Sequence, residues 1–350
     1  MLNFYSYNTA EMLGVTPLSR TPVPDGMIWE HLLTPTVKAL LGPITQIGQP
    51  TVFETATGHF PGDEATNLNA HIISGQTGSV RYPYVSVCHR TTYGALVIKR
   101  DLRKIKVCAW VGEVDSGKAE LIYMLGLRDR RYDGTKAAND TALLNFPYDD
   151  PVNQPLSKTL SSLEISIYCF QPGSKIQDAD GDLEFEQFVE KPFTFADRPE
   201  LFLKLFKRAW AGKRAPGQHA APIKDVARLV LPGIELVARR CGYDLLEAAC
   251  SHYHVAMWFT ASGFAYGYKH DQESMQAIAA GLKRVRDLGT PMTRAQQSWV
   301  CVLQNLPAEL VPEQLRLGVK WPQDNISPTS LWVCKALSQK ARELALPLER

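Results

Sequence analysis

Hydrophobic and polar positions alternate along the first half of the chain, whereas in the second half the hydrophobic positions recur at helical spacing. The segments rich in Val, Ile, Tyr and Cys are 79–89, 92–100, 104–114, 119–127 and 162–170. Short polar connections separate the first four, which is typical of antiparallel hairpins. Residues 128–160 are mostly polar and predict a long surface loop before the last of these segments. Loops of that length usually have a function or bind a partner.

From about residue 196 the spacing predicts helices. The candidates are 198–211, 223–241, 244–261, 272–288, 294–306 and 328–345, with start signals at Asp197, Asp271, Thr293 with Gln296, and Ser327. Gly242 and Gly289 stand where helices end. The pattern predicts an α+β protein, with an N-terminal antiparallel β-rich part with long loops followed by an all-α C-terminal part.

Three domains are expected from this organisation. Residues 1–26 carry Pro17, Pro22 and Pro24 and predict an extended N-terminal arm. A β-rich domain follows over 27–195, opening with a short helix from Met27, and an α-helical domain covers 196–350. With 350 residues the chain is long enough for more than one core.

The composition is that of an ordinary globular protein, 45% hydrophobic and 21% charged. No stretch approaches the ~18 apolar residues of a membrane span, and the first residues do not resemble a signal peptide. The seven cysteines form no CxxC pair, which favours reduced thiols. We therefore expect an intracellular protein, cytoplasmic or within a nucleoprotein particle, with no membrane partner and no cofactor.

Charge is distributed unevenly along the chain, although the net charge is only +2. Residues 151–200 carry four cations and nine carboxylates, a net −5, and residues 201–300 carry fourteen cations and seven carboxylates, a net +7. Such a split is typical of a protein that holds a polyanion with one part, or that stacks acidic face to basic face on copies of itself.

Two loops approach known ion-binding motifs but fail at defining positions. Residues 112–118 fit the start of a phosphate-binding P-loop, yet Ala119 lacks the metal-binding hydroxyl and the next segment predicts a strand rather than a helix. A hairpin turn explains these residues better. Residues 178–182 resemble the start of a calcium loop, but Leu183 replaces its glycine and Val189 its closing glutamate, so we expect a solvated acidic turn.

Histidines offer weaker chemistry. Cys250, His252 and His254 are possible metal ligands, but on one continuous helix His252 would point away from the other two, so no metal site is assigned. The run 58–63, Gly-His-Phe-Pro-Gly-Asp, resembles over those six residues the active-site loop of hot-dog-fold acyl-carrier-protein dehydratases, whose histidine is the base. The partner acid that this resemblance requires is missing, and no catalytic residue is assigned.

Basic clusters on the predicted helices are the stronger signal. Phe264 to His270 alternate aromatic and small residues, a composition that can stack unpaired bases while a basic groove follows the backbone, although a packed helix junction would have the same composition. The cations that end helices also suit the helix dipole. The candidate nucleic-acid-binding residues are Lys204, Lys207, Arg208, Lys213, Arg214, Arg239, Arg240, Tyr266, Tyr268, Lys269, Lys283, Arg284 and Arg286.

The leading functional prediction is a non-enzymatic nucleic-acid-binding assembly protein, such as a nucleoprotein, coat-like subunit or ribonucleoprotein-backbone subunit. Single-stranded RNA is the favoured nucleic acid, and copies of the same chain are the second partner. One alternative is an enzyme with a cleft at the β/α junction that uses His59 or His252 and His254. The other is a protein-only scaffold in which the charge split serves self-association alone.

Overall fold

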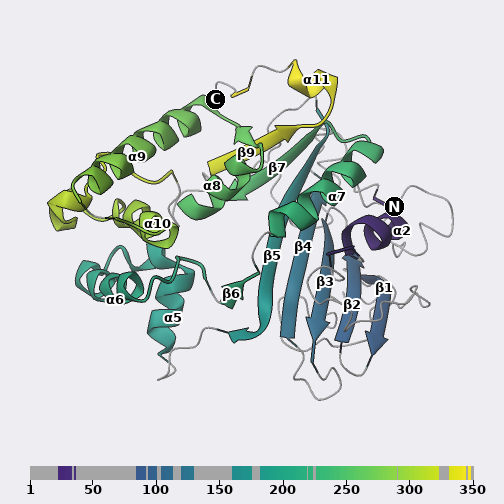
Figure 1. Ribbon diagram of the computed structural model, residues 1–350, viewed down its shortest axis with the longest axis horizontal. Coiled ribbons are helices and arrows are strands. Elements are labelled where there is room, and N and C mark those ends of the chain that lie inside the picture. Colours follow the sequence, from purple (N-terminus) through teal and green to yellow (C-terminus); the bar gives the residue numbers. More distant parts are fainter. Residues whose placement is uncertain are drawn as a thin grey trace, which may run out of the picture.

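A computed structural model of the 350-residue chain confirms the α+β class, with strands dominating the N-terminal part and helices the C-terminal part (Figure 1). The residues that the structure describes are 23–33, 35–36, 84–91, 94–100, 104–112, 120–129, 160–175, 182–218, 220–223, 226–289, 291–322, 331–343 and 346–347. The predicted arm up to residue 22, the excursion over 130–159 and the 58–63 loop with His59 lie outside them. The predicted division into domains stays a prediction.

The predicted antiparallel strands are confirmed, and they form one half of a large sheet. In chain order they are β1 (Tyr84–Thr91), β2 (Gly94–Arg100), β3 (Lys104–Val111), β4 (Glu120–Asp129) and β5 (Ser162–Lys175), each antiparallel to the one before it. The segment that follows the P-loop-like sequence is strand β4, which pairs with β3 and places Glu120 opposite Val111. A P-loop needs a helix at this point, so these residues do not form one.

The C-terminal part extends the same sheet, which corrects two predicted helices. Strand β7 (Leu245–Cys250) runs parallel to β5, and β9 (Leu331–Ala336) is antiparallel to β7, so 244–261 and 328–345 are not continuous helices. Both strands are short runs of buried, mostly apolar residues. A buried strand of that kind lacks the alternation that distinguishes it from a helix in a sequence. Two shorter strands, β6 (Ala220–Pro222) and β8 (Ala265–Tyr266), pair with β5 and β9.

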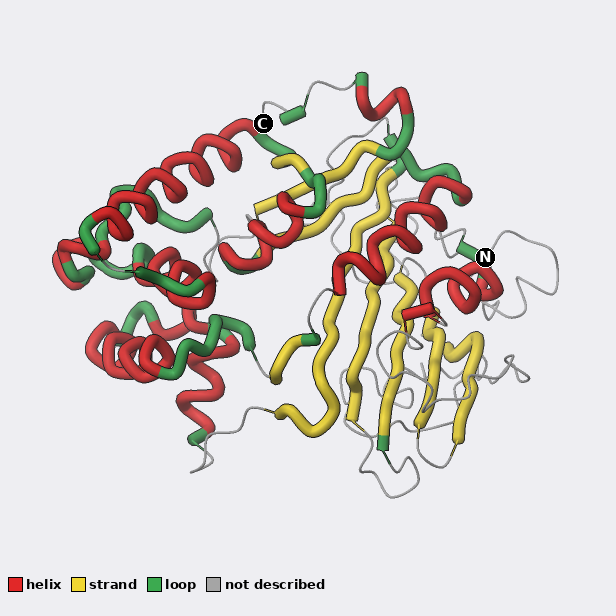
Figure 2. Tube along the Cα trace, in the orientation of Figure 1, coloured by secondary structure: helices red, strands yellow, loops and turns green. Residues whose placement is uncertain are grey.

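The described strands form one nine-stranded sheet, with helices on its faces and a helical cluster beyond β7 and β6 (Figures 1 and 2). The helices are α2 (Asp25–Ile28), η1 (Trp29–Leu33), α5 (Leu183–Glu190), η6 (Pro192–Phe195), α6 (Pro199–Ala211), α7 (Val226–Arg240), α8 (Tyr253–Ala261), α9 (Lys269–Asp287), α10 (Arg294–Leu303), η7 (Ala308–Leu310), η8 (Glu313–Leu315) and α11 (Gln339–Arg342).

Several predicted helix boundaries are confirmed by their cap geometry. Thr293 and Gln296 form a complete capping box at the start of α10. Gly242 and Gly289 take the left-handed conformation after α7 and α9, with φ of 73° and 89°. Asp197, by contrast, does not cap α6, because the N-cap residue is Arg198 and makes no side-chain hydrogen bond there.

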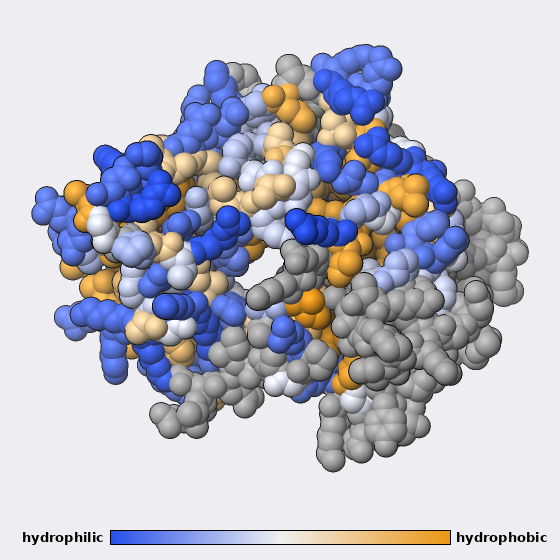
Figure 3. Space-filling view, in the orientation of Figure 1, coloured by the Kyte–Doolittle hydropathy of each residue, from blue (hydrophilic) through white to orange (hydrophobic). Residues whose placement is uncertain are grey.

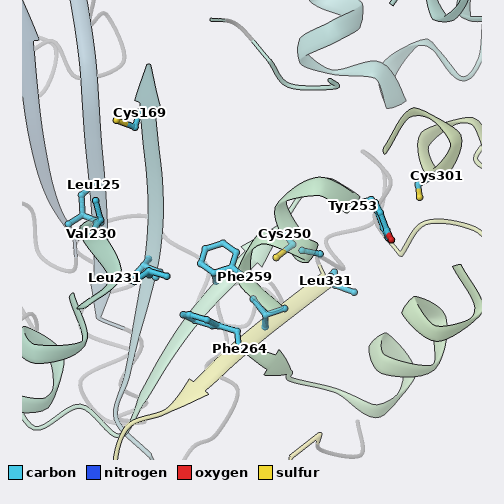
Figure 4. Close-up of a cluster of buried hydrophobic side chains, with 14 of the residues drawn as sticks. Leu125, Cys169, Val230, Leu231, Cys250, Tyr253, Phe259, Phe264, Cys301 and Leu331 are labelled. Atoms are coloured by element: carbon cyan, nitrogen blue, oxygen red, sulfur yellow. The ribbon is translucent and has the colours of Figure 1, made fainter. Parts of the chain in front are cut away.

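One buried hydrophobic cluster joins the strands to the helices. Val230 of α7 lies beside Leu125 of β4, and the cluster continues through Leu231, Phe259 of α8 and Phe264 (Figure 4). Among the described residues no helix is long and apolar enough to cross a membrane.

Candidate functional site

Three of the predicted cations are exposed lysines of α6 and of the turn after it. The apolar face of α6 is buried, with Phe202, Leu205, Phe206 and Ala209 inside. Lys204 and Lys207, one turn apart, both lie on its exposed face, and the exposed Lys213 follows the helix end. Among the described residues none of these three lysines forms an ion pair. We call Lys204, Lys207 and Lys213 the lysine face.

Lys213 ends α6 in an unusual way. Its φ is +52°, in the left-handed region, while the backbone N–H groups of Lys213 and Arg214 donate to the carbonyls of Trp210 and Ala209. This is the Schellman arrangement, in which the left-handed position is normally glycine because a side chain there costs about 1 kcal/mol or more. Gly212, directly before it, keeps a helical φ of −75°.

The two arginines next to the lysine face are held by carboxylates of α5. Arg208 Nη1 lies 2.7 Å from Asp182 Oδ2, and both terminal nitrogens of Arg214 lie 2.6 Å from the carboxylate oxygens of Glu186. The guanidinium carbons of both arginines lie over the ring of Phe185, 4.2 Å from its centroid for Arg208 and 5.8 Å for Arg214. Arg214 is only 7% exposed. These two arginines therefore fasten α5 to α6, and Arg214 is closed to an external phosphate.

The ion pairs of α5 and α6 reduce the charge separation that the sequence predicts. Asp182 and Glu186 belong to the acidic segment, and Arg208 and Arg214 belong to the basic one. Because the two segments fold against each other, part of the sequence dipole is neutralised inside the helical cluster. A charge count along the chain could not predict this, because it does not register which charges face each other.

Helix α7, whose last turn holds Arg239 and Arg240, lies on a different part of the molecule from α6 (Figure 1). Arg239 donates to the carbonyl of Leu337, and Arg240 Nη1 lies 2.9 Å from His31 Nε2. The structure does not bring these two arginines together with the lysine face.

At the end of α9, three more predicted cations are exposed. Lys283 is paired with Asp287 at 2.5 Å, and Arg284 donates to the carbonyl of Leu317 at 3.0 Å. The hydrogen bond and charge of Lys283 lower the pKa of the Asp287 carboxyl, and the charge of Arg286 lowers it further. In Figure 3, hydrophilic residues dominate the outer edge of this helical side of the molecule.

The tyrosines of the aromatic segment, Tyr266 and Tyr268, are partly buried and packed against neighbouring elements. Tyr266 pairs with Val333 in the sheet, and burial raises the pKa of its hydroxyl. Tyr268 precedes α9, packs against a small buried cluster and stacks on His270 at 5.9 Å. Lys269, the last predicted site residue of this segment, is exposed in the first turn of α9.

His252 and His254, which the sequence analysis named for the enzyme alternative, form a stacked pair where α8, α10, η6 and the turn after α6 meet. The rings of His252 and His254 stack with centroids 5.8 Å apart and 10° between planes, and Phe193 stacks on the outer side of His252 at 6.0 Å. Sequence reasoning placed both histidines on one helix, pointing apart. The strand β7 ends at Cys250 and α8 begins at Tyr253, and this break allows the two rings to face each other.

The electrostatic environment keeps both imidazoles neutral at pH 7. Desolvation by burial and the neighbouring His254 lower the pKa of His252 to about 3. Desolvation and Arg294 lower the pKa of His254 to about 4. Ser298 Oγ is hydrogen-bonded to His254 Nδ1 at 3.0 Å, the spacing of a nucleophile and its base. Ser298 is, however, completely buried, so its hydroxyl is closed to a substrate.

Metal and thiol chemistry also find no support around this pair. The described residues contain no group of three or more His, Cys, Asp or Glu side chains arranged to hold a metal ion. Burial raises the pKa of the nearby thiols of Cys250 and Cys301, which makes them poor nucleophiles. Of the calcium-like turn, only Asp182 is described, and its carboxylate caps α5 and pairs with Arg208.

In comparisons with known proteins, no family model, no curated protein and no solved structure matches the chain.

Proposed function

We propose that this chain is a non-enzymatic nucleic-acid-binding assembly protein that contacts the phosphate backbone through the lysine face. The observation that carries the proposal is the contrast on α6: Lys204, Lys207 and Lys213 are exposed and form no ion pair with described residues, while the neighbouring arginines are engaged by Asp182 and Glu186. Lysines that are not already neutralised are the ones that can replace the counterions of a polyanion.

A second helix, α10, is joined to the end of α6 and begins with a further cation, Arg294. The start of α10 is joined to the end of α6 by hydrogen bonds from Gln296 to the carbonyl of Trp210, at 3.5 Å, and from Trp299 to the carbonyl of Arg214, at 2.5 Å. Arg294, the first residue of α10, is exposed beside this junction. Contacts of this kind position a backbone without reading bases, so binding is tolerant of sequence.

Affinity for a fluorescein-labelled single-stranded RNA of about 20 nucleotides tests the proposal by anisotropy. The double variant Lys204→Gln/Lys207→Gln should weaken binding about tenfold or more at low salt, because two phosphate contacts are lost. The matched control is Arg228→Gln/Arg240→Gln, which removes the same charge from exposed positions of α7. Equal affinities of wild type and lysine variant would contradict the proposal.

Self-association belongs to the same proposal and is tested separately. The particle mass of the purified protein, measured by light scattering before and after nuclease treatment, should fall if nucleic acid holds copies together. A large particle that nuclease leaves unchanged, with a low 260/280 absorbance ratio, would favour the protein-only scaffold. Location inside a cell or a nucleoprotein particle is also proposed. No disulfide joins the six cysteines whose side chains the structure describes, which is typical of proteins in a reducing compartment.

The enzyme alternative gains no comparable observation. Figure 3 shows the molecule hollowed between its strand side and its helical side, where that alternative would put a cleft. His252 is nevertheless only 7% exposed, and no described carboxylate hydrogen-bonds to either imidazole of the pair. A general base needs access to its substrate and a group that orients it.

A further inference from the structure

Four segments of the helical cluster meet at the stacked histidines. Phe193 comes from η6, His252 and His254 from the start of α8, and Ser298 from α10. The fourth segment is the turn after α6, where Gly217 lies so close that an added Cβ would be 3.2 Å from the His252 ring. These rings therefore join elements that are otherwise separated by up to about a hundred residues.

Among the described residues, no carboxylate is placed to balance the charge of a protonated imidazole at this junction. His252 Nδ1 is buried and has no hydrogen-bond partner among the described residues. The groups that face the two rings are the other ring of the pair, Arg294 and Ser298 of α10, and the uncharged Phe193 and Gly217. An imidazolium formed here would face a second imidazole and a guanidinium, without a described carboxylate to balance it.

We propose that the stack of Phe193, His252, His254 and Ser298 is an acid-sensitive latch, which opens the junction of α8, α10 and the turn after α6 when the two imidazoles take up protons. The latch does not depend on nucleic-acid binding. It lies close to the lysine face in the chain, because Lys213 and Gly217 belong to the same loop after α6. The charge of Arg294 also acts on His254.

The sign of the pH effect follows from the direction in which the imidazole pKa values move. Folding lowers them below the ordinary value of about 6.5, so the open state binds more protons than the closed state at acidic pH. Closure is therefore fully favoured above pH 6.5 and weakens as the pH falls from 6.5 towards 4. Between pH 7 and pH 5 each imidazole that protonates on opening raises the opening equilibrium about 25-fold, and two raise it on the order of 600-fold.

Hydrogen–deuterium exchange on the full chain tests the latch. At pH 5.0 and 7.0, with rates corrected for the intrinsic effect of pH, peptides covering α8 and α10 should show an opening equilibrium at least about 25-fold larger at pH 5.0. Peptides of β2 and β3 serve as the internal reference and should change much less. Equal corrected protection of α8 and α10 at the two pH values would overturn the proposal, whatever the variants show.

Two variants separate this latch from general acid sensitivity. His252→Phe keeps an aromatic ring between Phe193 and His254, but that ring cannot take up a proton. The increase in the opening equilibrium of α8 and α10 between pH 7.0 and 5.0 should therefore be at least tenfold smaller in this variant than in the wild type. His270→Gln removes a half-exposed histidine of α9 and should keep the full effect. A His252→Phe protein with the pH dependence of the wild type would also overturn the proposal.

Discussion

Arg214 is a buried cation whose partner was not evident from the sequence. Both its terminal nitrogens contact Glu186 at 2.6 Å, while Nε donates to the carbonyl of Gln218 at 2.8 Å. Its place in a run of basic residues predicted a phosphate contact, but the carboxylate that holds it lies 28 residues earlier on a separate helix. Local sequence reports charge and spacing, and it does not report which side chains become neighbours.

Replacing Arg214 tests its structural role. Arg214→Gln should lower the free energy of unfolding by about 3 kcal/mol, because Glu186 would keep a partly buried charge without its partner. Urea titration followed by circular dichroism measures the change. Lys283→Gln, which breaks an exposed pair with Asp287, is the comparison and should leave the midpoint almost unmoved. A similar effect of the two substitutions would contradict the role assigned to Arg214.

Lys213 gives a prediction in which stability and binding change in opposite directions. Glycine is favoured at its φ of +52°, so Lys213→Gly should raise the free energy of unfolding by about 1 kcal/mol. The same change removes a cation from the lysine face and should weaken RNA binding. Urea titration and anisotropy on one variant measure both effects. If Lys213→Gly lost no affinity, Lys213 would have to be removed from the proposed contact surface.

At the scale of elements, alternating hydrophobic and polar residues and helix caps predicted the correct secondary structure, whereas the buried strands were predicted as helices. Strands β1 to β4 have polar hairpin connections that mark them in the sequence, and α10 has its capping box. Strands β7 and β9 are mostly buried, so their hydrophobic runs do not alternate and resemble a helical segment in the sequence. The misassigned strand β7 also concealed the histidine pair, because the position of His252 depends on where the strand ends.

Gly233 controls how closely α7 approaches η1. A Cβ added at Gly233 would lie 2.4 Å from the carbonyl oxygen of His31, which is backbone and cannot swing aside. Gly233→Ala should therefore lower the free energy of unfolding by about 2 kcal/mol, although alanine is the better helix former. Thermal unfolding measures this, with Ala substituted at Gly212, where the nearest atom is 3.5 Å away, as the control. A stabilised Gly233→Ala protein would show that the contact is looser than described.

On the scale of the whole molecule, sequence segments of opposite charge do not become opposite faces. The α+β class follows from the two hydrophobic periods, but the sheet draws strands from both halves of the chain. The acidic helix α5 lies against the basic helix α6, and helix α7 lies elsewhere (Figure 1). What remains for a polyanion is a smaller, more local surface than the net charge of 201–300 suggests.

The salt dependence of RNA binding tests the central claim most directly. For single strands the slope of log K against log salt concentration is about −0.7 for each phosphate contact, so the lysine face predicts a slope near −2 for the wild type. Lys204→Gln/Lys207→Gln should make that slope shallower by about 1.4, whereas Arg228→Gln/Arg240→Gln should leave it unchanged. A wild-type slope near zero, or an equal slope in wild type and lysine variant, would contradict the account.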